Sequence, residues 1–244
     1  MTKKICAKRT KTSPFFVALF VLLAIYSLML VGLLVWAMIS SLKAPRDFQT
    51  NPVGLPEKIV NNFAKAIKLY KIQVGGIKGQ PRYDMFPQML YNSVVYSIGC
   101  ALINTAVTCI TAYCCARYKY KLSRIVYAVV LVTMTIPIVG SLPSQIQVAQ
   151  GLHIYNTIWG MWLQCASFLG LYFLVFYETF ASLPNSFFEA ARLDGAGDLS
   201  LLFRIALPLA GNVFLTIFML NFITYWNDYQ TPLLFLKSMP VLSY

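Results

Sequence analysis

The most specific pattern of polar residues in this chain lies in a short segment between two long apolar stretches. The segment reads Glu-Ala-Ala-Arg-Leu-Asp-Gly at 189–195, and Ile-Ala-Leu-Pro follows at 205–208. The two alanines keep a helix slim, so that another backbone can come close to it. This chemistry suits the docking of a soluble partner rather than the breaking of a bond. The residues that we expect at the docking surface are Glu189, Ala190, Ala191, Asp194 and Gly195.

Start and stop signals predict that this loop forms two short helices. Ser186 and Glu189 fit a capping box at the start of the first helix. Gly195 is the natural residue just past its end, because glycine tolerates a positive φ. Asp198 fits the N-cap of a second helix over 199–206, which the following proline closes. The pattern predicts a helix-turn-helix elbow, and the alternative is that these residues only cap and end helices.

Polar side chains inside the apolar stretches are the second group of candidates. Such residues are costly in a bilayer and usually face the interior of a helix bundle, where they can line a path for a polar solute. The competing interpretation is helix packing, because small and hydroxyl side chains let helices approach closely. Packing is favoured for the stretch 89–116, and both interpretations stay open for the later residues. The candidates are Asn104, Thr108, Gln164, Asn221, Thr224 and Tyr225.

Other reactive side chains form no recognisable site. The chain has a single histidine, His153, and its six cysteines lack metal-ligand spacing. Most of these cysteines lie in or beside apolar runs, which is typical of small buried side chains. The glycine-rich segment 75–79 lacks the ending of a phosphate loop. We therefore predict no catalytic residue, no metal and no nucleotide bound by this chain.

Composition restricts the class of protein. The chain has 244 residues, of which 58% are hydrophobic and only 11% are charged, whereas soluble domains carry about 25% charged residues. An ordinary soluble domain is therefore excluded, and membrane lipid is an expected partner. The net charge of +12 does not indicate nucleic-acid binding, because the basic residues flank apolar runs without forming a known binding motif.

Five segments are long and apolar enough for membrane spans, which need about 20 residues each. We therefore predict an all-α polytopic membrane protein. The first segment is too long for a signal peptide, so we expect a retained anchor. The last residues, 236–244, read like a loop that stops midway, and we expect a sixth span to be missing at the C-terminus. The predicted spans are 15–40, 89–116, 125–142, 157–180 and a fifth that begins near 209 and fades at 226–236.

The distribution of basic residues predicts the orientation. Five of them between Lys3 and Lys11 precede the first span, and four between Arg117 and Arg124 follow the second. Short basic loops stay in the cytoplasm, whereas long loops translocate regardless of charge. The predicted parts are a cytoplasmic tail at 1–14, the span 15–40, an external segment at 41–88 with a surface helix near 61–71, and a core at 89–244 that includes the cytoplasmic loop 181–208.

The pattern EAA-x3-G-x9-I-x-LP at 189–208 resembles the signature loop of the membrane subunits of ABC importers. The chain is similar to permeases of type I ABC importers over about 15–244, and most similar to the second permease of carbohydrate importers of the maltose type. The departure that we expect from that family is the absence of a sixth span. Further segments that carry the resemblance are Asn92-Ser93, Ala112-Tyr113, Ala116-Arg117, Leu183-Pro184, Trp226–Tyr229 and Pro232-Leu233.

The resemblance implies a type I ABC importer permease fold and a division of labour. It implies a second homologous permease, two ATPase subunits that hold ATP and Mg²⁺, and an extracellular binding protein that delivers a sugar. Glu189, Ala190, Ala191 and Gly195 map onto the family's coupling helix, and we expect Glu189 to meet a basic residue of the ATPase. The implied location is the plasma (inner) membrane of a bacterium, with the N-terminus in the cytoplasm.

Three alternatives stay open beside this interpretation. An ABC permease for amino acids or peptides shares the same loop, and only the segment 226–229 favours carbohydrate. An ion-coupled secondary transporter usually has internal repeats and charges within the membrane, and these spans contain almost none. An intramembrane enzyme needs a converging set of His, Asp or Glu side chains within the spans, and the single histidine does not provide one.

Overall fold

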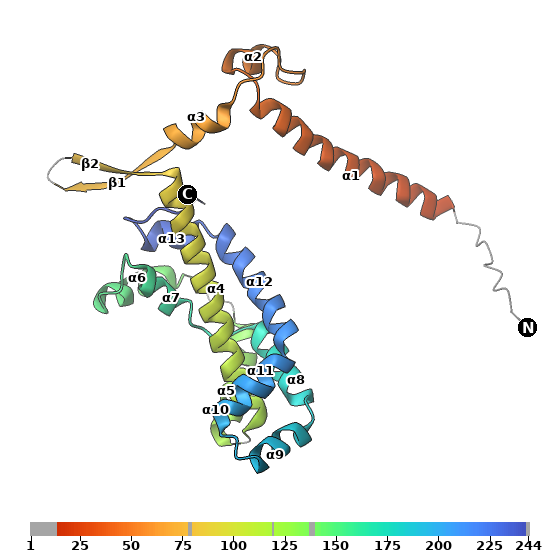
Figure 1. Cartoon of the computed structure of the whole chain (residues 1–244), viewed down its shortest axis with the longest axis vertical. Coiled ribbons are helices and arrows are strands. Elements are labelled where there is room, and N and C mark those ends of the chain that lie inside the picture. The colour runs from red at the N-terminus through yellow and green to blue at the C-terminus, as the bar shows by residue number, and fades with distance from the viewer. Residues whose placement is uncertain (1–13, 78–79, 119, 137–139, 243–244) are drawn as a thin grey trace, which may run out of the picture. The chain divides into compact units, whose positions relative to one another are not determined.

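The computed structural model describes residues 14–77, 80–118, 120–136 and 140–242 (Figure 1). The predicted basic tail before Pro14 lies outside the described residues, and so does Lys119. The chain divides into two compact units, Met1–Leu69 and Tyr70–Tyr244. The division falls earlier in the chain than the predicted start of the core at 89.

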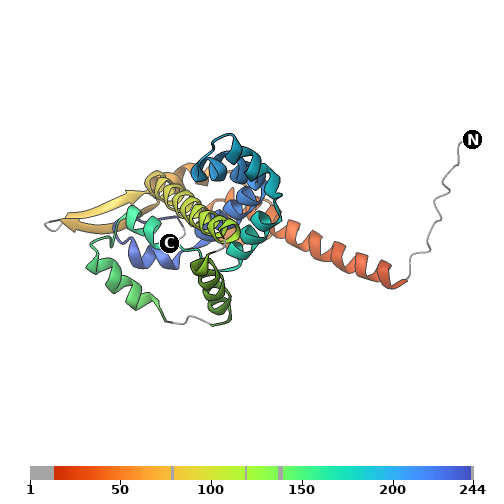
Figure 2. The ribbon, with the colours of Figure 1, turned by 90° about the horizontal axis from the view of Figure 1, so that it is seen from below.

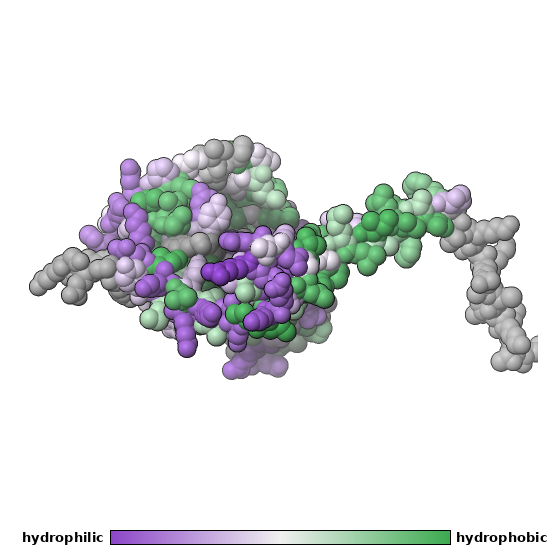
Figure 3. Space-filling model, turned by 90° about the horizontal axis from the view of Figure 1, so that it is seen from above, coloured by the Kyte–Doolittle hydropathy of each residue, from purple (hydrophilic) through white to green (hydrophobic). Residues whose placement is uncertain are grey.

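The first unit is built on one long apolar helix. Helix α1 spans Pro14–Ser41, contains no charged residue and has no buried residue within the chain. Its surface is hydrophobic on the face shown in Figure 3. Helices α2 (Pro45–Thr50) and α3 (Asn62–Leu69) follow. Helix α1 coincides with the predicted span 15–40, and α3 confirms the surface helix expected near 61–71.

The second unit opens with a β-hairpin that an all-helical prediction omits. Strand β1 (Lys71–Ile77) pairs antiparallel with β2 (Gln80–Met85), and the register shifts between Gln73 and Gly76. The sequence alternates polar and apolar residues from Lys71 to Val74, which is the period of a strand. The glycines expected to form a turn at 75–79 begin inside β1, and residues 78–79 lie outside the described part.

Helix α4 (Phe86–Arg117) is the central element of the second unit. It contacts α5 (Lys121–Thr135), α8 (Leu171–Ser182) and α12 (Gly211–Asn227), and Figure 2 shows it between α5 and the helices of the C-terminal half. Small side chains along one stripe of α4 let these helices approach closely. The buried stripe consists of Ser93, Ser97, Cys100, Ala101, Thr105, Thr108 and Ala112.

Three of the five predicted spans are interrupted. Residues 157–180 do not form one helix, because α7 (Ile158–Gln164) and α8 are separated by an irregular segment. The span predicted at 125–142 ends with α5 at Thr135, and α6 (Leu142–Gly151) follows. Beyond α12, the chain continues in α13 (Gln230–Phe235). Within the described residues, α1 and α4 are each long and apolar enough to cross a membrane. The helical stretches Asp198–Leu209 and Gly211–Asn227, bent by 78° at the break between them, would together form a third span.

Two hydrophobic clusters pack against different parts of α4. One joins the C-terminal half of α4 to α8 and the start of α12 through Tyr113, Phe176 and Phe180. The other joins Tyr96 and Cys100 to α6, α7 and α13. The first cluster supports the loop 181–208, so that the loop rests on a packed base.

Candidate functional site: an exposed helical loop and a buried polar cluster

Helix α9 (Asn185–Leu193) carries most of the predicted docking residues. It begins directly after Pro184, which is the N-cap, and no side chain caps it. Ser186 is therefore inside the first turn, and the predicted capping box is wrong. The start is set instead by a contact from α4, which holds Leu183 and Asn185 in place.

The C-terminal end of α9 agrees with the prediction. Gly195 has φ +83°, a conformation that glycine adopts without strain. The amide of Gly195 donates to the carbonyl of Arg192 (3.0 Å), and the amide of Ala196 donates to the carbonyl of Ala191 (2.9 Å). These two bonds form a Schellman motif, which satisfies carbonyl groups that would otherwise lack partners. The loop therefore keeps a defined backbone without help from another protein.

The predicted docking residues lie on the surface of the loop. Glu189, Ala190, Asp194 and Gly195 are exposed, and Ala191 is half-buried. The side chain of Phe188 points the other way and packs in the hydrophobic cluster, only 7% exposed. Leu193 is 90% exposed, which is unusual for a leucine beside a packed core. The outer face of α9 is thus free to meet a partner.

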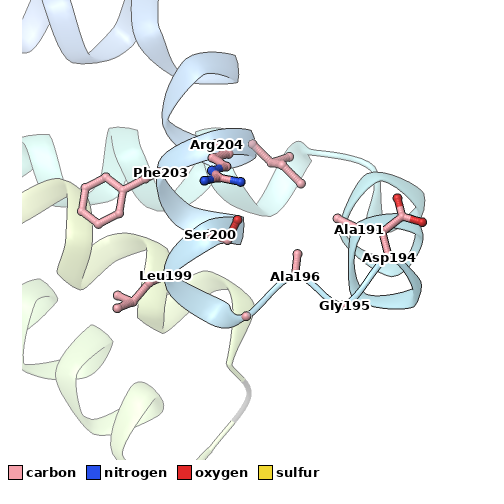
Figure 4. A pocket seen from close by; sticks show the side chains of 10 residues that line it. Ala191, Asp194, Gly195, Ala196, Leu199, Ser200, Phe203 and Arg204 are labelled. Atoms are coloured by element: carbon pink, nitrogen blue, oxygen red, sulfur yellow. The ribbon is translucent and has the colours of Figure 1, made fainter.

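A second arm faces the end of α9 across a cleft of about 740 Å³ (Figure 4). Ala191 and Asp194 line it from α9, and Leu199, Phe203 and Arg204 line it from the second arm, with Leu199 and Phe203 pointing away from α9 in Figure 4. Leu199 is 74% exposed and Phe203 is 54% exposed. The cleft therefore combines apolar side chains with one carboxylate and one guanidinium, a mixture typical of protein interfaces.

The second arm departs from the predicted helix over 199–206. Asp198 is the first residue of α10 (Asp198–Ser200) and not its cap, because Gly197 takes the cap position. Its carboxylate pairs with Arg192 at 3.4 Å instead. The chain continues as a π-helix, η1 (Leu201–Ala206), and as α11 (Leu207–Leu209).

Pro208 explains the π-helix but does not end the arm as predicted. A proline lacks an amide hydrogen, and its ring crowds the carbonyl four residues earlier. The wider π-turn relieves this crowding, since the amide of Leu207 bonds to the carbonyl of Leu202, five residues back. Such π segments occur often at functional sites. The arm then bends by 78° into α12.

Arg117, the last residue of α4, anchors the start of α9. Its guanidinium donates to the Asn185 side-chain oxygen (2.7 Å) and to the carbonyl of Leu183 (2.9 Å). It also lies 3.8 Å above the ring of Phe188. From the sequence, Arg117 was expected to mark the cytoplasmic side and to carry part of the family resemblance. Its contact with α9 was not predicted.

The irregular segment between α7 and α8 is stabilised by side chains of α4. The Asn104 side chain donates to the carbonyls of Cys165 (2.9 Å) and Ser167 (3.3 Å). Thr108 donates to the carbonyl of Ser167 as well, at 3.0 Å. These bonds supply partners for backbone carbonyls that helix geometry leaves unpaired, which a membrane interior requires.

Asn221 of α12 completes this polar cluster. It is 6% exposed, and its amide donates to Asn104 (3.1 Å) and to the hydroxyl of Thr105 (2.9 Å). Three predicted path residues, Asn104, Thr108 and Asn221, therefore come together. Their polar groups bond to one another and to the backbone, which is the arrangement expected for helix packing.

The other three predicted path residues lie apart from this cluster. Gln164 donates to the side chain of Gln145 at 2.8 Å. Thr224 is exposed and bonds back to the carbonyl of its own helix, four residues earlier. Tyr225 is half-buried and packs edge-to-face on Tyr96, with ring centroids 6.2 Å apart. Among the described residues, no group of three or more His, Cys, Asp or Glu side chains could hold a metal ion.

The apolar helices and the exposed loop between them define a helical membrane protein. The family described as "Binding-protein-dependent transport system inner membrane component" matches residues 105–243, which is more than half of the chain. The chain belongs to this family of inner-membrane transport components. The resemblance to ABC importer permeases is thereby confirmed at the level of the family.

Relatives and a solved structure agree with this assignment. The chain is 26% identical to the diacetylchitobiose uptake system permease protein NgcG of Streptomyces coelicolor, over 86% of this chain and 66% of that protein. It is 30% identical to the sn-glycerol-3-phosphate transport system permease protein UgpE of Yersinia enterocolitica, over 61% of this chain and 53% of that protein. The chain thus spans between about half and two thirds of these relatives.

The fold is that of a known transporter. A crystal structure of a bacterial ABC transporter involved in the import of the acidic polysaccharide alginate matches 96% of this chain and 81% of that chain. The TM-score is 0.79 and the sequence identity is 21%. The predicted permease fold is therefore confirmed.

Proposed function

We propose that this chain is the permease subunit of an ATP-driven importer for a sugar or oligosaccharide. The observation that carries the proposal is the exposed helix α9, which has a self-contained C-terminal end and a start anchored on α4. Family membership supports a transport role. The names of relatives that take up diacetylchitobiose and glycerol 3-phosphate support a polar, hydroxyl-rich substrate.

In this proposal, α9 docks on a separate cytoplasmic ATPase. Glu189 meets a basic residue of that subunit, and the exposed Leu193 and Leu199 meet apolar side chains. ATP and Mg²⁺ belong to the ATPase, a second permease forms the other half of the path, and an extracellular protein delivers the sugar. The N-terminus then lies in the cytoplasm, on the same side as α9.

Arg117 transmits the movement of α9 to the membrane part. When the ATPases close, α9 moves, and the two hydrogen bonds of Arg117 pull the end of α4 with it. Helix α4 in turn carries Asn104 and Thr108, which hold the irregular segment before α8. The motion is a rigid-body rotation of packed helices, which opens the path alternately to the two sides.

The test is assembly and uptake with the partner subunits. The chain is co-expressed with its candidate partner permease and ATPase, and co-purification is compared for wild type and for Glu189→Ala combined with Gly195→Pro. The matched control is Glu57→Ala, which removes an exposed carboxylate from the first unit. Loss of the ATPase from the double variant alone supports docking through α9. Equal association of all three proteins would refute it.

The substrate is tested separately in vesicles that contain the complete transporter. Uptake of labelled diacetylchitobiose is compared with uptake of glycerol 3-phosphate and of a dipeptide. We expect ATP-dependent uptake of diacetylchitobiose, the sugar, and not of the other two solutes. Uptake of the dipeptide alone would replace the carbohydrate assignment with a peptide permease while leaving the docking role intact.

A further inference from the structure

Helix α3 has two chemically different faces, and neither face is buried in the interior of its unit. Phe63, Ala66 and Ile67 share one face at helical spacing, whereas Lys65 and Lys68 lie on the opposite face. No residue of α3 is buried, and Phe63 and Ile67 are 58% and 45% exposed. A helix with an uncovered apolar face and a basic face matches those that lie in membrane interfaces.

The start of α3 is fixed beside the end of α1. The Asn62 side chain donates to the carbonyls of Ser41 (2.9 Å) and Lys43 (2.7 Å). The amide of Val60 donates to the carbonyl of Leu42 at 2.9 Å. Two hydrogen bonds from the first residue of α3 and one from Val60 just before it therefore hold the start of α3 beside the end of α1.

The length of α1 and its Trp36 place that end at the membrane surface. Its 28 residues span about 42 Å at 1.5 Å per residue, whereas the hydrocarbon core is about 30 Å thick. Helix α1 is therefore longer than the core is thick, and Trp36 indicates that its C-terminal turns are the part among the lipid headgroups. Trp36 lies in this part and donates its indole N–H to the carbonyl of Pro52 at 2.9 Å, and tryptophan is enriched at that depth.

An apolar groove lies between the end of α1, α2 and α3. It measures about 570 Å³, and its lining includes Trp36, Phe48, Phe63 and Ala66. The lining includes Trp36 at the end of α1, and α1 has no buried residue. Because lipid must surround an exposed apolar helix that crosses a membrane, the same lipid reaches the mouth of this groove.

We propose that α3 is an interfacial helix that lies in the membrane leaflet where α1 ends, with lipid acyl chains in the groove beside Phe63. Lys65 and Lys68 extend to the headgroups on the opposite face, as long basic side chains do at interfaces. The role of α3 is to fix the depth of α1 and of the segment that follows it. This inference does not rest on the proposed transport function.

Photo-crosslinking in the complete transporter tests the inference. The photoreactive analogue benzoylphenylalanine replaces Phe63 or Ile67, with Lys65 and Lys68 as matched positions on the other face. The protein is reconstituted in vesicles of phosphatidylethanolamine and phosphatidylglycerol, and lipid adducts are measured by mass spectrometry. We expect roughly threefold more acyl-chain adducts at the apolar positions than at the lysine positions.

Two results would overturn the inference. Equal lipid adducts at all four positions would show that α3 has no preferred face. Adducts from Phe63 and Ile67 to another protein subunit would show that a protein covers the groove. A fluorophore at the same positions, quenched by spin-labelled lipids, gives an independent reading of depth, and quenching strongest near the headgroups is expected.

Discussion

The loop 181–208 and the polar cluster around Asn104 lie in the same unit of the chain, yet their polar side chains are arranged in opposite ways. The loop satisfies its backbone internally through Gly195 and leaves the Glu189 carboxylate exposed. The cluster buries Asn221 and Thr108 and half-buries Asn104, and these side chains bond to one another or to backbone. One region keeps its side chains available for a partner, and the other uses them to hold helices together.

This difference bears on where substrate contacts can arise. A buried amide that already has partners can bind a sugar only if it gives up those bonds, which costs about 1–3 kcal/mol for each group left unpaired. The half-buried Gln164 would also have to give up its bond to Gln145, whereas the half-buried Tyr225 lies outside the cluster with its ring against Tyr96. In the proposed sugar importer, Tyr225 is therefore the first of the predicted path residues to test for a direct contact with the substrate.

The largest expected effect is at the end of α9. Proline at position 195 cannot adopt φ +83° and has no amide hydrogen to donate, so Gly195→Pro removes the Schellman motif. We expect this to lower the free energy of unfolding by about 3 kcal/mol or more. We expect co-purification with the ATPase to fall by roughly tenfold or more. Gly195→Asn is the control, because asparagine tolerates positive φ. If both variants retained the ATPase, the loop backbone would not matter for docking.

The two ends of α9 show what sequence reasoning can and cannot predict. Gly195 acts locally, so its role was predictable from the residue alone. The start depends on Arg117, 68 positions away from Asn185, and no local signal reveals that contact. The break between α7 and α8 was missed for the same reason, because Asn104 and Thr108 satisfy its carbonyls from 59–63 positions away. The apolar composition there looks like an unbroken helix.

Arg117 is expected to have the next largest effect. Arg117→Met loses two charge-assisted hydrogen bonds and the contact with Phe188, at about 2–3 kcal/mol. Because α9 itself stays folded, the ATPase should still bind, while sugar uptake per ATP hydrolysed falls about tenfold. Transport and ATP hydrolysis are measured together in vesicles.

Two further variants make the test of Arg117 specific. Arg117→Lys keeps the charge but cannot form both bonds in the same geometry, so partial recovery is expected. A double-mutant cycle with Asn185→Ala should give a coupling energy of about 1 kcal/mol. If the two substitutions changed the free energy additively, there would be no direct interaction between Arg117 of α4 and Asn185 of α9.

Asn221 distinguishes packing from substrate contact inside the membrane. Asn221→Ala leaves Thr105 and Asn104 without a donor, and we expect the free energy of unfolding in detergent to fall by about 1–2 kcal/mol. Thr224→Ala, on the exposed side of the same helix, should leave stability within about 0.5 kcal/mol. If Asn221→Ala abolished uptake at unchanged stability, Asn221 would belong to the path and the contrast between the two regions would fail.

The smallest effect is expected for the ion pair between Arg192 and Asp198. The two side chains are 58% and 69% exposed, and the oxygen-to-nitrogen distance is 3.4 Å. Water and salt screen such a pair, so Asp198→Asn should change the free energy of unfolding by less than about 0.5 kcal/mol. Thermal unfolding at low and high salt measures this, with a small change expected at low salt and a still smaller one at high salt. A larger loss confined to the complex with the ATPase would mean that Asp198 contacts the partner, and the docking surface would then extend from α9 across the cleft to the second arm.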